Sequence, residues 1–250
     1  RRDAAFFRPL AKALPSAYVV GMKTKKEIAK RYGGLCVALF VCALGVALIT
    51  NAHLGTSPIT SLPYALTFML PLSLGAFTFL SNIIFLVIQK MLLGKQFGIV
   101  QMMQLPAVLI FGIFIDFWMW ATTPLIADNY IWQVFMCVAG SAVLGLGISL
   151  EIVCNATVLP GEGMVIAIAY KTRKMFANIK ILFDISLVIS AATLALVVLG
   201  EIVGLREGTV LSAFLVGQFV KLTSGWARRL KPLFWTARQR KQASALRIPR

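Results

Sequence analysis

The sequence predicts an all-α polytopic membrane protein with six transmembrane helices. Hydrophobic residues make up 59% of the 250 residues and charged residues only 14%, whereas a soluble domain carries about 25% charged residues. Nine Lys and Arg residues lie in 1–31 and nine in 221–250, so basic ends flank an apolar middle. This distribution excludes a water-soluble enzyme, and it excludes a nucleic-acid-binding module, which carries its basic residues on a folded surface.

Six apolar runs reach the roughly 20 residues that a membrane helix needs, at about 33–51, 73–93, 97–121, 131–152, 176–199 and 207–224. Two shorter runs, at about 58–71 and 160–170, fit half helices or re-entrant segments. The expected parts are therefore a basic N-terminal arm (1–32), two membrane repeats (33–121 and 131–224) and a basic C-terminal tail (225–250). Met22 has the form of a start site, so residues 1–21 either belong to the native chain or precede it.

The positions of the basic residues predict the orientation. With the N-terminus in the cytoplasm, 24 of the 25 Lys and Arg residues fall on the cytoplasmic side, and only Arg206 falls outside. Cytoplasmic loops carry this excess of positive charge. We therefore expect a multi-pass protein of the bacterial cytoplasmic (inner) membrane with both termini in the cytoplasm.

A shift of 102 residues aligns the two membrane halves without a gap. Under this shift Gly45 falls on Gly147 and Pro58 on Pro160, and the intramembrane pairs Asn82 with Asp184 and Asp116 with Gln218 coincide. Each half has three spans, so two repeats would be inserted in opposite directions, as in many secondary transporters. The alternative is that two apolar halves align by chance.

Each short run begins at a proline that follows a stretch rich in helix breakers. The stretches are 51–58 and 154–162. Proline suits the first turn of a helix, where no N–H donor is needed, and Ser57 is expected to cap the first short helix. Unwound backbone at membrane depth lies in protein or faces a water-filled cavity, and paired breaks indicate a transporter binding site.

These residues give the chain a resemblance to the YczE/YyaS/YitT family of bacterial integral membrane proteins, over roughly residues 30–225. The resemblance implies an uncharacterised or transporter-like membrane protein. In the first half the family's Trp-Asp pair is replaced by Ile59-Thr60, which argues against two symmetric carboxylates. The residues that carry the resemblance are Gly45, Leu54-Gly55-Thr56-Ser57-Pro58, Pro160-Gly161-Glu162, Lys180 with Asp184, Gly208-Thr209 and Gly217.

Charged residues at membrane depth cost about 2.5–3.5 kcal/mol each and indicate function. Four acids qualify: Asp116, Glu151, Glu162 and Asp184. Asp116 has an interfacial alternative, as does Glu151. Glu162 opens the second short helix, where it either binds a ligand or stabilises the helix dipole. Asp184 lies four residues after Lys180, so the two are expected to form an ion pair.

The remaining polar residues offer weaker signals. His53 is the only histidine and is either a proton carrier or an interfacial residue. Asn82 is expected to hydrogen-bond across helices, and Gln101, Gln104 and Gln218 either line a polar path or join helices. The four cysteines and the single histidine lack metal-site spacing, and no nucleotide or hydrolase motif is present. We therefore expect no metal, no cofactor and no enzymatic activity.

Together these features predict a secondary carrier of a small solute, cationic or zwitterionic and coupled to protons or sodium, with its site at the repeat interface. The expected partners are the lipid bilayer and the solute, with no nucleic acid, and small-residue pairs allow a homodimer. The alternatives are an accessory or sensor subunit and, further off, an intramembrane enzyme. The expected binding residues are His53, Thr56, Ser57, Asn155 and Glu162, and the expected coupling or cavity-lining residues are Asn82, Asp116, Asp184, Lys180 and Gln218.

Overall fold

The computed structural model describes residues 25–125, 129–174 and 176–234, and within these residues the regular structure is helical throughout. Six of the helices are long and apolar enough to cross a membrane. The predicted all-α polytopic fold is therefore confirmed.

The helices follow the expected order closely. The six long helices are α2 (Lys25–Asn51), α4 (Leu74–Leu93), α6 (Gln104–Ala121), α7 (Tyr130–Cys154), α9 (Phe176–Leu199) and α10 (Glu207–Ala227). The two half helices are α3 (Pro58–Thr67) and α8 (Pro160–Thr172). Short helical turns complete the described chain: η2 (Gly94–Gln96), α5 (Ile99–Met102), η3 (Thr123–Leu125), η4 (Arg228–Leu230) and α11 (Lys231–Phe234).

Two of the expected helix starts were wrong. The first helix begins at Lys25 rather than near residue 33, because its basic first turns extend the helix beyond the apolar run. The third span begins at Gln104 rather than near residue 97, and α5 precedes it as a separate turn. Pro106 has no N–H to donate to the carbonyl of Met102, and its ring crowds that carbonyl, so a continuous helix is interrupted there.

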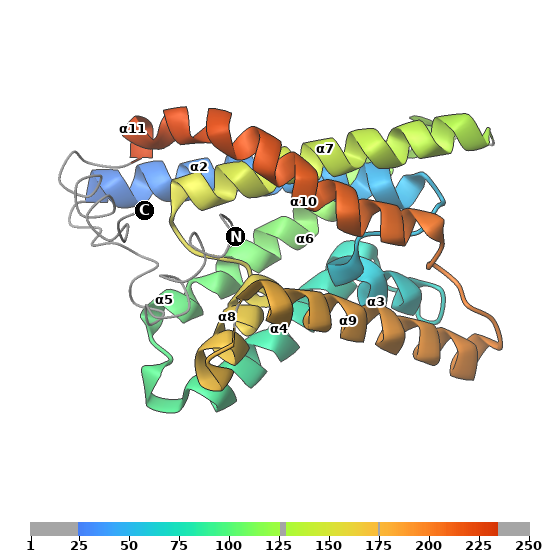
Figure 1. Ribbon diagram of the computed structural model, residues 1–250, viewed down its shortest axis with the longest axis horizontal. Coiled ribbons are helices and arrows are strands. Elements are labelled where there is room, and N and C mark those ends of the chain that lie inside the picture. Colours follow the sequence, from blue (N-terminus) through green and yellow to red (C-terminus); the bar gives the residue numbers. More distant parts are fainter. Residues whose placement is uncertain (1–24, 126–128, 175, 235–250) are drawn as a thin grey trace.

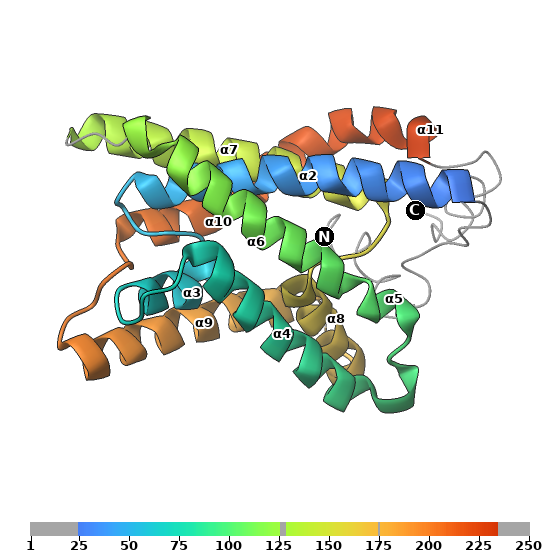
Figure 2. The same ribbon diagram turned by 180° about the vertical axis from the view of Figure 1, so that it is seen from behind.

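The long helices gather in two bundles. In the first bundle α2 packs along α7, with α6 against α2 and α10 against α7. In the second bundle α3 packs on α9 and α4 packs on α8. Figures 1 and 2 show α2, α7 and α10 along one side of the molecule, and α4, α8 and α9 along the other. The bundles meet where α4 packs against α6 and where α3 touches α10.

Glycine allows the close crossing of α2 and α7 at the centre of the first bundle. A Cβ atom on Gly45 would lie 2.5 Å from the backbone N of Leu144, and one on Gly147 would lie 2.5 Å from Sγ of Cys42. Small residues at such crossings let membrane helices approach closely. These two contacts join positions 45 with 144 and 42 with 147, which exchange with each other under the 102-residue shift.

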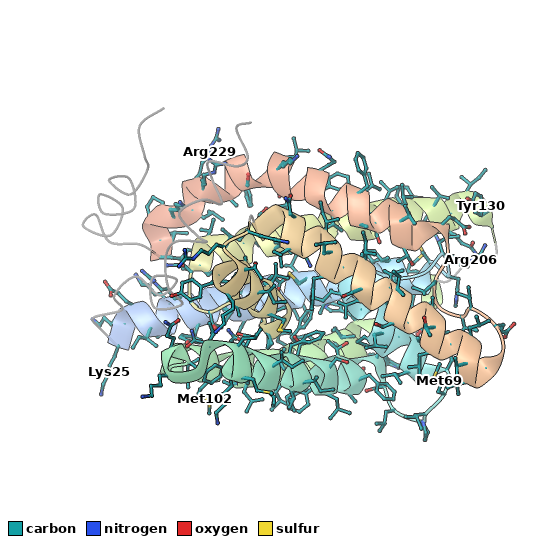
Figure 3. The ribbon with its side chains drawn as sticks, turned by 60° about the horizontal axis from the view of Figure 1, so that its bottom comes forward. Lys25, Met69, Met102, Tyr130, Arg206 and Arg229 are labelled. Atoms are coloured by element: carbon teal, nitrogen blue, oxygen red, sulfur yellow. The ribbon has the colours of Figure 1, made fainter. Side chains whose placement is uncertain are left out.

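The spans run from one end of the molecule to the other. Figure 3 places Lys25, Met102 and Arg229 at one end, and Met69, Tyr130 and Arg206 at the opposite end. The first of these ends carries the basic first turns of α2 and the basic η4 turn. We call it the basic end.

Candidate functional site

The first helix break, residues 52–57, holds a buried chain of hydroxyl groups. Its backbone turns sharply because His53 and Gly55 have left-handed φ angles of 55° and 111°. Thr56 Oγ1 lies 2.8 Å from Oγ1 of Thr50 and 2.8 Å from Oγ1 of Thr60, and Ser57 Oγ lies 2.7 Å from the same Thr60 oxygen. Ser57 occupies the N-cap position of α3, but its side chain makes no capping bond. The expected cap was wrong because Thr60 binds the Ser57 hydroxyl.

The start of α10 seals this first break. The N–H of Gly208 donates to the carbonyl of Leu54 at 2.8 Å, and the N–H of Thr56 donates to Oγ1 of Thr209 at 3.2 Å. Ser212 Oγ donates to the carbonyl of Thr56 at 3.4 Å. The polar backbone of the first break is thus satisfied by α10. His53 is exposed, and Arg206 donates to its carbonyl oxygen.

The second helix break, residues 155–159, is fixed by the backbone conformation at its start and by two side chains from neighbouring helices. Asn155 ends α7 in the left-handed region with φ 48°. The N–H of Leu159 donates to the carboxylate of buried Glu151 at 3.3 Å, and Gln89 Nε2 of α4 donates to the carbonyl of Pro160 at 2.9 Å. Side chains of α4 and α7 therefore bind backbone groups of the second break and of the first residue of α8.

Arg31 is a functional candidate that the sequence reasoning missed. Its side chain is fully buried, and its guanidinium donates to the carbonyl oxygens of Asn155 and Phe234, each at 3.2 Å. It thereby ties α11 to the second break. The sequence grouped Arg31 with the basic arm. Its place next to the apolar run, as the last basic residue before it, is the signal that could have set it apart.

The two half helices meet at their N-termini. Gly161 stands against the side chain of Ile59, and a Cβ atom on Gly161 would collide with Cδ1 of that side chain. Helix N-termini carry a partial positive charge. The junction of α3 and α8 therefore brings two positive helix ends together in the second bundle.

Charged side chains lie beside this junction. Lys180 and Asp184 of α9 form an ion pair with an Nζ–Oδ1 distance of 2.7 Å, as predicted, and both side chains are about a quarter exposed (28% and 24%). Glu162 lies within electrostatic range of this pair and of Glu151. Glu162 thus lies between the Lys180–Asp184 pair and Glu151 in electrostatic range.

Buried polar atoms without a hydrogen-bond partner gather on one side of the structure. Within the described residues they belong to α4 and to the segment from the second break into α8, and the first break contributes none. Native proteins leave few such atoms, and each one calls for an explanation. The atoms are Thr78 Oγ1, Asn82 Oδ1, Asn155 Nδ2, Thr157 Oγ1 and Glu162 Oε2.

The structure places two other expected residues, Asp116 and Gln218, away from these atoms. Asp116 lies far along α6, where its carboxylate accepts from Ser73 Oγ at 2.6 Å and from the N–H of Gly75 at 2.7 Å. It lines a cavity of about 310 Å³ together with Tyr64 and neighbours from α3, α4 and α6, but without Asn82 or Asp184. Asn82 donates to the carbonyl of Thr78 within α4, and Gln218 is exposed on α10.

A second, smaller cavity lies next to the second break. Its volume is about 20 Å³, which is enough for one water molecule. Gln89, Gln101 and Gln104 line it together with Val158 and Gly163. The three glutamines come from α4, α5 and α6, so this polar space is where the two bundles meet near the basic end.

No group of three metal-binding side chains occurs within the described residues. Comparison with known proteins gives one match: a family model described as a family of unknown function (DUF6198) covers residues 29–225. No curated protein and no solved structure matches the chain. The matched family carries no YczE/YyaS/YitT name, so that likeness stays a prediction.

Proposed function

We propose that this chain, which belongs to the DUF6198 family of unknown function, is a secondary carrier of a small solute. The observation that carries the proposal is the junction of two half helices, each preceded by an unwound segment, with Glu162 and the Lys180–Asp184 pair beside it. Broken helices of this kind form the binding sites of many carriers.

An inverted repeat would give this junction its symmetry. The half helices begin at residues 58 and 160, and the helices after them begin at 74 and 176, so both pairs of starts differ by 102. The packing of α3 on α9 and of α4 on α8 is reciprocal under the same shift. Ile59 and Gly161 are themselves equivalent positions, which would place a pseudo-two-fold axis between them.

The charges favour a cationic or zwitterionic solute, or coupling to protons or sodium. Glu162 and Asp184 lie within electrostatic range of Lys180, and Glu151 lies within range of Glu162. The unpartnered atoms of Glu162 and Thr157 are oxygens, and oxygen ligands are the ones that hard cations prefer. The resemblance to the transporter-like YczE/YyaS/YitT family points the same way.

Uptake into proteoliposomes tests the proposal. Vesicles that contain a pH-sensitive dye are given a gradient of ²²Na⁺ or of protons, with and without a panel of amines and amino acids. Glu162→Gln and Asp184→Asn are expected to lower flux about tenfold or more, because each removes a charge-assisted interaction worth about 1.5–3 kcal/mol. Glu201→Gln, an exposed acid between α9 and α10, serves as the matched control. Flux in both site variants that equals the wild-type flux would reject this site.

We also propose that the basic end faces the cytoplasm of a bacterium. Thr123→Cys and Lys95→Cys place thiols at exposed positions beyond the two ends of α6. In intact cells a membrane-impermeant maleimide is expected to label position 123 directly and position 95 only after permeabilisation. Labelling of position 95 in intact cells would reverse the orientation.

A further inference from the structure

The two halves of the chain differ in how their last two helices pack. In the first half α4 packs against α6. The equivalent helices of the second half, α9 and α10, make no comparable contact, and Figure 1 shows α9 in the lower part of the view and α10 in the upper part. We call each of these two helix–helix interfaces a seam. The α4–α6 seam is closed, and the equivalent α9–α10 seam is parted.

Glycine and a carboxylate close the α4–α6 seam away from the basic end. The backbones of Gly75 and Gly112 touch, so a Cβ atom on Gly75 would collide with the carbonyl oxygen of Gly112. Asp116 then binds both Ser73 and the N–H of Gly75. Because its acceptor is charged, this pair of bonds is stronger than a neutral pair.

The second half has no such closure. The position equivalent to Gly112 is Phe214, whose side chain is 65% exposed. The position equivalent to Asp116 is Gln218, which is exposed and neutral. On α10, the two positions that correspond to the closing residues of α6 are thus exposed.

The two breaks show the same contrast. At the first break the N–H of Gly208 binds the carbonyl of Leu54, which ties α10 to the chain. The residue equivalent to Gly208 is Pro106, which has no N–H to offer the second break. There Asn155 Nδ2 and Thr157 Oγ1 lack partners, and the small glutamine-lined cavity separates Val158 from α6.

We propose that transport exchanges two arrangements: the one seen here, with the α4–α6 seam closed and the α9–α10 seam parted, and its counterpart, with the α9–α10 seam closed and the α4–α6 seam parted. Two latches hold the present arrangement: Asp116 with Ser73 and Gly75, and Thr209 and Gly208 with the first break. This inference rests on the proposed carrier function.

The exchange follows from the physics of two similar seams. Helices that pack in one half have counterparts in the other, so closing α9 on α10 while opening α4 from α6 produces a related arrangement. Packed interfaces switch between discrete arrangements rather than deforming continuously. A ligand at the junction touches both halves and shifts the equilibrium toward the arrangement that binds it better.

Paired spin labels test the exchange without any solute. One pair, at Leu72 and Trp120, spans the α4–α6 seam, and the pair at Lys174 and Leu222 occupies the equivalent positions of the α9–α10 seam. All four residues are exposed. The labels are attached to cysteines in a variant whose four native cysteines are replaced by alanine, in lipid nanodiscs. Electron–electron dipolar spectroscopy then gives both distances.

In the otherwise unaltered chain we expect the 174–222 distance to exceed the 72–120 distance. Asp116→Leu combined with Thr209→Val is expected to raise about tenfold a population in which 72–120 lengthens and 174–222 shortens. Asp116→Asn can keep both latch bonds through its amide, so it is the milder variant. Its population of the exchanged arrangement is expected to lie between those of the unaltered chain and the double variant, and it can be measured even if the double variant does not fold.

Two results would overturn the inference: a 174–222 distance no longer than 72–120 in the unaltered chain, or a 72–120 distance that lengthens in the latch variants while 174–222 stays fixed. Flux is a separate readout. If the protein transports a solute while both distances stay fixed, the exchange is rejected and the carrier function stands. If the distances exchange but no member of the panel is transported, the carrier function is rejected.

Discussion

Gly147→Leu is expected to lower the free energy of unfolding by roughly 3 kcal/mol, the upper part of the usual range for overpacking. The backbone N and Cα of Cys42 lie 2.7 and 3.0 Å from the Cβ position of residue 147. A backbone cannot rotate out of the way as a flexible side chain can, so α2 and α7 would have to separate. Unfolding in a titration of sodium dodecyl sulfate measures the loss.

Gly217→Leu is the matched control, because nothing lies within 4 Å of the Cβ position at Gly217 on α10. Its stability is expected to stay within about 0.5 kcal/mol of the unaltered chain. Gly45→Leu, which meets the backbone of Leu144 in the equivalent contact, is expected to match Gly147→Leu. A Gly147→Leu chain as stable as the control would mean that the crossing is not tight.

Arg31→Met is expected to cost about 3 kcal/mol, because it leaves the carbonyls of Asn155 and Phe234 without the charged donor that binds them. The break should then loosen next to Cys154, whose side chain is 2% exposed. We expect the thiol of Cys154 to react with a maleimide about tenfold faster or more, in a chain whose other cysteines are replaced.

Lys30→Met is the control for this experiment, because Lys30 is the exposed neighbour of Arg31 on α2. It removes one positive charge from the same helix turn without touching the break. Arg31→Lys keeps the charge with fewer donors and is expected to restore part of the protection of Cys154. Equal labelling rates in the Arg31→Met and Lys30→Met variants would show that Arg31 does not hold the break.

The spans could be predicted because apolar length alone identifies a membrane helix. The starts of α9 and α10 lie at residues 176 and 207, as expected. The start of α2 could not be predicted in this way, since its first turns are polar and continue the helix beyond the apolar run. Pro106 was visible in the sequence, but whether it kinks a helix or ends one depends on the packing around it.

The breaks of the candidate site were also predictable, since Pro58 and Pro160 fix where each half helix begins. The partners of the polar residues were not. Periodicity placed Lys180 and Asp184 on one face, because both belong to a single helix. No local pattern in the sequence indicates that Asp116 binds the start of α4, or that Arg31 binds a carbonyl 124 residues away. Such pairs depend on which helices become neighbours.

If the two halves are the inverted repeats proposed above, the contact between Ile59 and Gly161 has a consequence for the symmetry of the junction. On a true two-fold axis a residue faces its own copy, so a dimer of identical half-length chains would place two isoleucines or two glycines there. Two isoleucines would crowd each other, because a Cβ atom at position 161 already meets the end of the Ile59 side chain, and two glycines would leave a void. In a single chain the two equivalent positions carry different residues, so isoleucine packs against glycine and the junction is filled without a collision.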